Sequence, residues 1–132
     1  MGVKYLLDTH AFIWLLTDPA RLSDEVLRNL ANPANPLFVS SASAMEVATK
    51  VRLGKFPDAA VLVDSWETQV NAIGAEDLPI RGAHALLAGR MDWAHRDPFD
   101  RLLAAQALLD NLTLVTGDHM LHGLPGLRIL RV

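Results

Sequence analysis

Short apolar segments alternate with longer helical patterns along this chain, and this alternation restricts the fold more than any other feature of the sequence. The segments that we predict to be strands are residues 3–7, 37–40, 71–75, 112–116 and 127–132. The predicted helices are residues 9–17, 23–31, 43–53, 58–69, 79–88 and 97–110. Strands that alternate with helices of this length indicate an α/β fold with a mostly parallel sheet. The strands are apolar on both faces, as expected where helices cover both sides.

Length and composition exclude several classes of protein. The chain has 132 residues, of which 51% are hydrophobic and 20% are charged, so we expect one folded domain over residues 1–132. It contains no cysteine, which excludes disulfides, thiolate zinc sites and a cysteine nucleophile. The apolar N-terminal segment is interrupted by Asp8 and His10 and is too short to span a bilayer. We therefore expect a cytoplasmic protein without membrane contact. The net charge of −3 gives no sign of a basic nucleic-acid-binding surface.

Acidic residues follow or precede the predicted strands at one edge of the sheet, where parallel α/β folds bind their ligands. They come from four separate segments and are Asp8, Glu46, Asp97 with Asp100, and Asp118. At an effective dielectric of about 20, two unit charges ~4 Å apart repel by roughly 4 kcal/mol. Helix N-termini offset only about 0.3–1 kcal/mol each. A compensating charge is therefore expected at this edge.

Every acid except Asp8 also fits a purely structural interpretation well. Residues 43–46 fit a capping box, with the serine as N-cap and the glutamate in the first helical turn. Asp97 fits the N-cap of the helix that follows it, and Asp118 fits the cap of a short turn. Asp8 is the exception, because Thr9 is the more natural cap for the first helix.

A hard divalent cation is the compensating charge that suits this set best. Oxygen ligands in a chain without cysteine favour Mg²⁺ or Mn²⁺. A cation of this kind acidifies a bound water and stabilises the charge of a phosphoryl transition state. The residues therefore predict hydrolysis of a phosphodiester bond.

The segments that carry these acids resemble the PIN domain family, and more narrowly the VapC-type toxin ribonucleases of bacterial toxin–antitoxin pairs. The similar segments are LLDTHAFIWLL, SAMEV, DPFDRLLAAQA and LVTGD, which occur in the order and spacing of the family. The resemblance implies a three-layer α/β/α sandwich with a mostly parallel central sheet. It also implies a Mg²⁺- or Mn²⁺-dependent endoribonuclease that acts on RNA, forms a homodimer and is inhibited by a small antitoxin protein.

The resemblance assigns the family's acidic residues to Asp8, Glu46, Asp100 and Asp118. Hydroxyl groups that orient the acids or the metal-bound waters fall on Thr9 and Thr116. Asp97 is either an outer acid of the metal site or simply the helix N-cap.

The mechanism predicted from these residues is metal-assisted hydrolysis. Asp8, Asp100 and Asp118 hold the metal, directly or through water. Glu46 either completes the metal shell or orients the water that attacks the phosphate in line. No histidine is needed as a base, because water bound to a metal is already acidified.

Several other residues have two interpretations each. Arg101 adjoins the predicted site and either contacts RNA phosphates or belongs to a solvated face. The apolar residues 12–16 form core, or in part a groove for an antitoxin helix or a dimer partner. Trp93 is either core or a platform for an RNA base. We do not expect the histidines to bind a metal, although His10 is a candidate for contact with substrate.

Other classes of function also remain open from the sequence. A phosphohydrolase or phospho-acceptor domain would also place acids on a parallel sheet. An aspartyl-phosphate phosphatase usually has a second Asp two residues after the first, whereas Asp8 is followed by Thr9 and His10. A PIN-like domain that is a nuclease without being a toxin, or a catalytically silent one that only binds a partner, is a further alternative. The presence of all four acids weighs against the silent domain.

Overall fold

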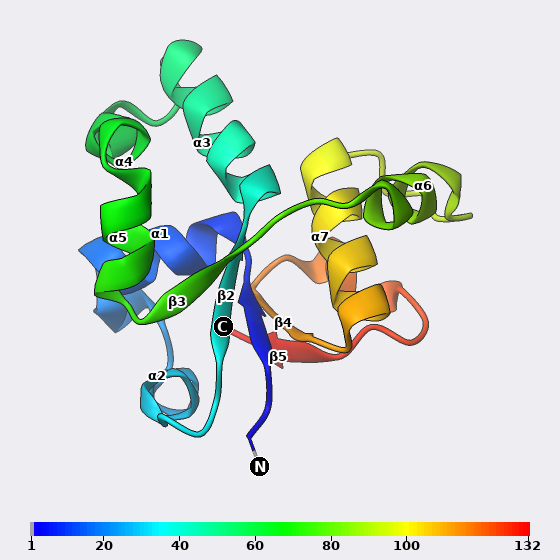
Figure 1. Ribbon diagram of the computed structural model, residues 1–132, viewed down its shortest axis with the longest axis horizontal. Helices are drawn as coiled ribbons and strands as arrows, with labels where there is room; N and C mark the ends of the chain where they lie inside the picture. Colours follow the sequence, from blue (N-terminus) through cyan, green and yellow to red (C-terminus); the bar gives the residue numbers. More distant parts are fainter. Residues whose placement is uncertain (1) are drawn as a thin grey trace.

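A parallel five-stranded sheet forms the centre of the computed structural model, which describes residues 2–132. The strands lie in the order β3-β2-β1-β4-β5, and every neighbouring pair is parallel (Figure 1). Their bounds are β1 Tyr5–Leu7, β2 Leu37–Ser40, β3 Ala75–Leu78, β4 Thr113–Thr116 and β5 Ile129–Arg131. The chain builds the sheet to one side of β1 and then to the other, so the strand order reverses between β1 and β4. The carboxyl ends of strands at such a switch point are where open parallel sheets bind ligands.

Helices cover both faces of the sheet (Figure 1). They are α1 Thr9–Thr17, α2 Asp24–Ala31, α3 Ser41–Arg52, α4 Ala60–Asp64, α5 Trp66–Ala72, α6 Gly82–Arg90 and α7 Pro98–Asp110, with 3₁₀ turns at Pro19–Arg21, Pro57–Ala59 and His119–Gly123. Tyr5 and Leu7 join the core beneath α1, α2 and α5, whereas Leu6 joins the core beneath α7. Successive side chains of a strand point to opposite faces, so β1 supplies both cores. The predicted three-layer α/β/α sandwich is confirmed.

The predicted capping box in residues 43–46 is wrong. The helix begins at Ser41, directly after β2, and the hydroxyl of Ser40 accepts a hydrogen bond from the Ala42 backbone N–H at 2.9 Å. Ser40 is the last residue with an extended backbone, so it occupies the N-cap position. Ser43 and Glu46 consequently lie inside the helix, where both side chains are buried.

The segment between β2 and β3 also differs from the prediction. The predicted helix 58–69 is divided at Ser65 into α4 and α5, and the predicted strand 71–75 begins instead at Ala75. Gly74 has a φ of 71°, a backbone conformation that glycine adopts without strain and that ends α5. The edge strand β3 exposes Glu76 and Asp77, so it lacks the apolar pattern by which the other strands were predicted.

Within residues 2–132, no helix is long and apolar enough to cross a membrane.

Candidate metal centre

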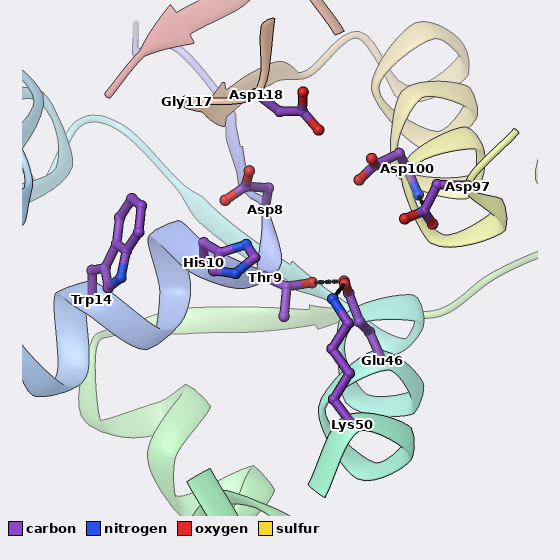
Figure 2. Close-up of a pocket in the computed structure, with 10 residues that line it drawn as sticks. All are labelled: Asp8, Thr9, His10, Trp14, Glu46, Lys50, Asp97, Asp100, Gly117 and Asp118. Carbon is purple, nitrogen blue, oxygen red and sulfur yellow. Dashed lines mark hydrogen bonds and ion pairs between the residues drawn. The ribbon is translucent and has the colours of Figure 1, made fainter. Parts of the chain in front are cut away.

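A pocket of about 350 Å³ opens at the carboxyl ends of β1 and β4, at the switch point of the sheet (Figure 2). Its lining is dominated by carboxylates, and all the acids singled out from the sequence contribute to it. The lining residues are Asp8, Thr9, His10, Trp14, Glu46, Lys50, Asp97, Asp100, Gly117 and Asp118. The predicted convergence of four chain segments at one sheet edge is therefore present in the structure.

Asp8 lies between β1 and α1 and is almost completely buried. Its side chain is the N-cap of α1 and accepts from the Ala11 backbone N–H at 2.7 Å, so the prediction that Thr9 is the cap is wrong. Burial raises the pKa of Asp8, and the nearby Glu46 charge raises it further, whereas hydrogen bonds from Thr116 and Ala11 lower it. The carboxylate is thus fixed in orientation but costly to ionise.

Glu46 reaches the pocket from the interior of α3 and not from its first turn, because the helix begins earlier than predicted (Figure 2). The Thr9 hydroxyl donates to Glu46 Oε1 at 2.5 Å and lies 3.0 Å from the Ser43 hydroxyl. Lys50, one turn further along α3, donates to Glu46 Oε2 at 2.5 Å. Glu46 is therefore held in place by Thr9 and partly neutralised by Lys50.

Asp100 lies in the first turn of α7, with Asp97 before it as the N-cap. The Asp97 side chain accepts from the Phe99 and Asp100 backbone N–H groups at 2.9 and 3.4 Å. This confirms Asp97 as the N-cap, and Asp97 also lines the carboxylate pocket. The pKa of Asp100 is raised to about 6, chiefly by burial and further by the charges of Asp97 and Asp118, whereas the hydrogen bond with His95 lowers it. Asp118 in turn caps the 3₁₀ turn after β4, accepting from the Met120 backbone N–H at 2.9 Å.

His95 contacts this site, although from the sequence we did not expect any histidine to bind a metal. Its Nε2 atom lies 2.7 Å from Asp100 Oδ2. One ligand atom each from His95, Asp100 and Asp118 lie within 4.8 Å of one another, a spacing that suits a shared metal ion. Its place in the sequence could have pointed to His95, because it lies in the short loop that leads into α7 and so comes just before Asp100.

The donor set of the pocket fits a divalent cation. Acidic side chains outnumber the cationic groups in the lining. Lys50, which is one of those cationic groups, is already paired with Glu46. Two of the acids, Asp8 and Asp100, have raised pKa values because burial and neighbouring carboxylates disfavour their ionised forms. A bound cation would offset the cost of burying these charges and the repulsion between them. Carboxylate oxygens are also the ligands that hard divalent ions prefer.

Arg101 does not point its charge at the pocket. Its guanidinium donates to the backbone carbonyls of Ala88, Met91, Trp93 and His95 at 2.7–2.9 Å. These bonds use four of the five N–H groups of an arginine, so they leave little capacity for RNA. Arg101 instead holds the loop between α6 and α7 that carries His95. Trp93 is partly buried and packs against the core beneath α7, with the Arg101 guanidinium 5.9 Å from its ring centroid.

Comparisons with known proteins agree with this architecture. The family model of the PIN domain matches residues 5–127. Among solved structures, the VapBC2 complex from Rickettsia felis, bound to a promoter DNA fragment, contains a chain with 18% identity and a TM-score of 0.71 over 98% of both chains. DNA-bound VapBC from Salmonella typhimurium gives 21% identity and a TM-score of 0.70 over 98% of both chains. VapBC-5 from Mycobacterium tuberculosis gives 20% identity and a TM-score of 0.59 over 99% of this chain and 100% of that chain. A comparison with curated protein sequences finds no match.

At these identities the solved structures show a common fold. The family model adds a sequence match that begins at β1 and ends just before β5, and it includes every carboxylate of the pocket. This protein therefore belongs to the PIN domain family.

Proposed function

We propose that this chain is a Mg²⁺- or Mn²⁺-dependent endoribonuclease, a single PIN domain over residues 1–132 that acts as the VapC-type toxin of a bacterial toxin–antitoxin pair. The observation that carries this proposal is the convergence of carboxylates from β1, α3, α7 and the end of β4 in one pocket. Their chemistry matches a site that binds a hard cation beside a phosphate oxygen.

The proposal gives parts to the acids of the pocket and to the residues that hold them. Asp8, Asp100 and Asp118 hold the cation, and Glu46 either completes its shell or orients the attacking water. Thr9 fixes Glu46, and Thr116 fixes Asp8 through its hydroxyl. The bound cation supplies an acidified water and stabilises charge on the phosphate oxygens. Lys50 lines the pocket beside Glu46, and its positive charge attracts the phosphate of the RNA.

The partners in this proposal are an RNA substrate and a small antitoxin protein, and the chain acts in the cytoplasm as a homodimer. Support for the antitoxin partner comes from the solved structures, which are VapBC complexes, one of them described as a member of a family of toxin–antitoxin systems. Each aligns over nearly the whole of this chain.

Expression of the chain in a bacterial culture tests the proposed toxicity. We expect growth arrest together with discrete RNA fragments, whose new 5′ ends can be mapped by primer extension. Asp8→Asn should abolish both effects, because asparagine retains the N-cap of α1 but lacks the negative charge. Growth arrest of equal strength with Asp8→Asn would contradict the proposal and favour a silent module that acts by binding.

The pKa of Asp100 predicts how stability and cation binding depend on pH. Its value of about 6, against 3.8 for the free side chain, means that the folded chain holds this proton more tightly than the unfolded chain. Without a cation, the free energy of unfolding should therefore fall as pH rises from about 4 to about 6. Cation binding requires the ionised carboxylate, so Mn²⁺ should raise the thermal unfolding midpoint more at about pH 7.5 than at about pH 5.

Thermal unfolding with and without MnCl₂ at the two pH values measures this difference. Asp100→Asn is the matched variant, since it removes the titrating group and should abolish most of the stabilisation by Mn²⁺ at either pH. A stabilisation by Mn²⁺ that is equal at both pH values, or larger at the acidic one, would refute the assignment of Asp100 as a cation ligand.

A further inference from the structure

A second pocket, of about 550 Å³, lies directly beside the carboxylate pocket. The two share His10 and Trp14 of α1, so a chain that is bound in one lies next to the other. The remaining walls come from the end of α1, the turn after it and the segment between α3 and α4. The lining residues besides the shared pair are Ile13, Thr17, Asp18, Arg21, Lys55, Phe56, Pro57, Asp58, Ala59 and Leu62.

Aromatic rings form the part of this second pocket nearest the carboxylates. His10 and Trp14 lie one turn apart on α1, with ring centroids 5.6 Å apart, and Phe56 meets the edge of His10 at 5.6 Å. In Figure 2, His10 and Trp14 follow Asp8 along α1 and lead away from the acids. We call His10, Trp14 and Phe56 the aromatic platform.

Cations accompany the aromatic platform on both sides. The Arg21 guanidinium carbon lies 4.9 Å from the Trp14 ring centroid, and Lys50 Nζ lies 5.1 Å from that of Phe56. Lys55 and two acids, Asp18 and Asp58, complete the polar rim. Rings for stacking combined with cations for phosphates are the elements with which proteins bind single-stranded nucleic acids.

We propose that the aromatic platform binds an unpaired base of the RNA, next to the phosphodiester bond held in the carboxylate pocket. This inference rests on the proposed ribonuclease function and specifies its substrate as single-stranded at that position. Three properties favour a nucleotide here: the two pockets are adjacent and share His10 and Trp14, the rings suit a flat base, and Arg21 and Lys55 suit its phosphates. Asp18 and Asp58 add hydrogen-bond acceptors for the N–H groups of a base. An apolar helix of a protein partner would instead bury this charged rim.

Binding of single-stranded RNA to a cleavage-deficient chain tests the proposal. The parent variant is Asp118→Asn, which keeps the turn cap but should not degrade RNA. Its affinity for a random-sequence pool of fluorescently labelled eight-nucleotide RNAs is measured by anisotropy in the presence of Mg²⁺. Adding Trp14→Leu should weaken binding about tenfold, the loss expected for one stacked base. Adding Trp14→Phe, which retains an aromatic ring, should change it by less than about threefold.

The contribution of charge at the second pocket is tested with a matched pair of arginines. Arg21→Gln, at the rim of the second pocket, should weaken binding about threefold to tenfold. Arg28→Gln, on the exposed surface of α2, should leave it unchanged. Equal losses for the two arginines would overturn the proposal, because binding would then reflect net charge alone. Thermal unfolding of each variant establishes that it is folded.

The outcomes also distinguish this inference from the proposed function. If the wild-type chain cleaves RNA and Trp14→Leu binds the RNA pool as tightly as its parent, the aromatic platform is overturned while the ribonuclease stands. If the wild-type chain does not cleave RNA but Trp14→Leu still weakens binding tenfold, the platform stands and the proposed catalysis fails. Unchanged RNA affinity in Trp14→Leu with loss of binding to a co-expressed antitoxin would assign the second pocket to a protein partner instead.

Discussion

Replacing Asp100 by asparagine should lower the rate of RNA cleavage by at least about 100-fold, because it removes a charged ligand from the centre of the proposed cation site. The same change should leave the metal-free chain at least as stable as the wild type. The raised pKa of Asp100 means that its ionised form destabilises the fold, and asparagine has no charge to bury. Loss of activity without loss of stability is the signature of a carboxylate kept for function. Cleavage of a labelled RNA and thermal unfolding, both at neutral pH, measure the two effects.

Asp92→Asn is the matched control for this variant. Asp92 is exposed in the loop before α7, close in sequence to Asp100 but absent from the lining of the carboxylate pocket. Its replacement should change the cleavage rate by less than about twofold, in line with the small effects of surface substitutions. Activity of Asp100→Asn within about tenfold of wild type would contradict the assignment of this residue, since loss of even an indirect metal partner usually costs 10–100-fold.

Replacing Arg101 by methionine should lower the free energy of unfolding by about 2–4 kcal/mol, the range expected when several hydrogen bonds from a charged group are lost together. Methionine keeps much of the apolar stem but leaves the carbonyls of Ala88, Met91, Trp93 and His95 without their shared donor. The loop that carries His95 would then lose its anchor, so RNA cleavage should fall as well. Urea unfolding at neutral pH measures the change in stability.

Arg90→Met provides the comparison for Arg101. Arg90 is exposed at the end of α6, and its loss should change the free energy of unfolding by less than about 0.5 kcal/mol. A chain with Arg101→Met that is as stable as wild type but binds RNA more weakly would restore the interpretation that Arg101 contacts substrate.

The elements that the sequence predicted well are those whose ends carry strong local signals. The helix over residues 9–17 was predicted with the bounds of α1, and Asp97 followed by Pro98 located the start of α7. The four acids could be brought together from the sequence alone, because the strand ends of a parallel sheet share one edge. The three-layer arrangement followed from the alternation of strands and helices.

The parts that escaped prediction depend on tertiary contacts. The start of α3 at Ser41 depends on where β2 ends, whereas the capping-box pattern of residues 43–46 pointed to a later serine as the cap. β3 is an edge strand with exposed acids, so its sequence lacks apolar alternation. Arg101 looked like a free charge beside the site, and only the path of the loop before α7 shows that its donors are occupied. His95 joins the acids for the same reason, because that loop returns to Asp100.

Cation dependence of RNA cleavage tests the central claim most directly. The purified chain, freed from any co-purifying peptide, is incubated with a labelled single-stranded RNA in EDTA and then with added Mg²⁺ or Mn²⁺. We predict no cleavage in EDTA, cleavage once the cation is restored, and no cleavage by Asp8→Asn under either condition. Cleavage that continues in EDTA, or an equal rate for Asp8→Asn with the cation present, would contradict the claim that the carboxylates at the ends of β1 and β4 form a catalytic metal centre.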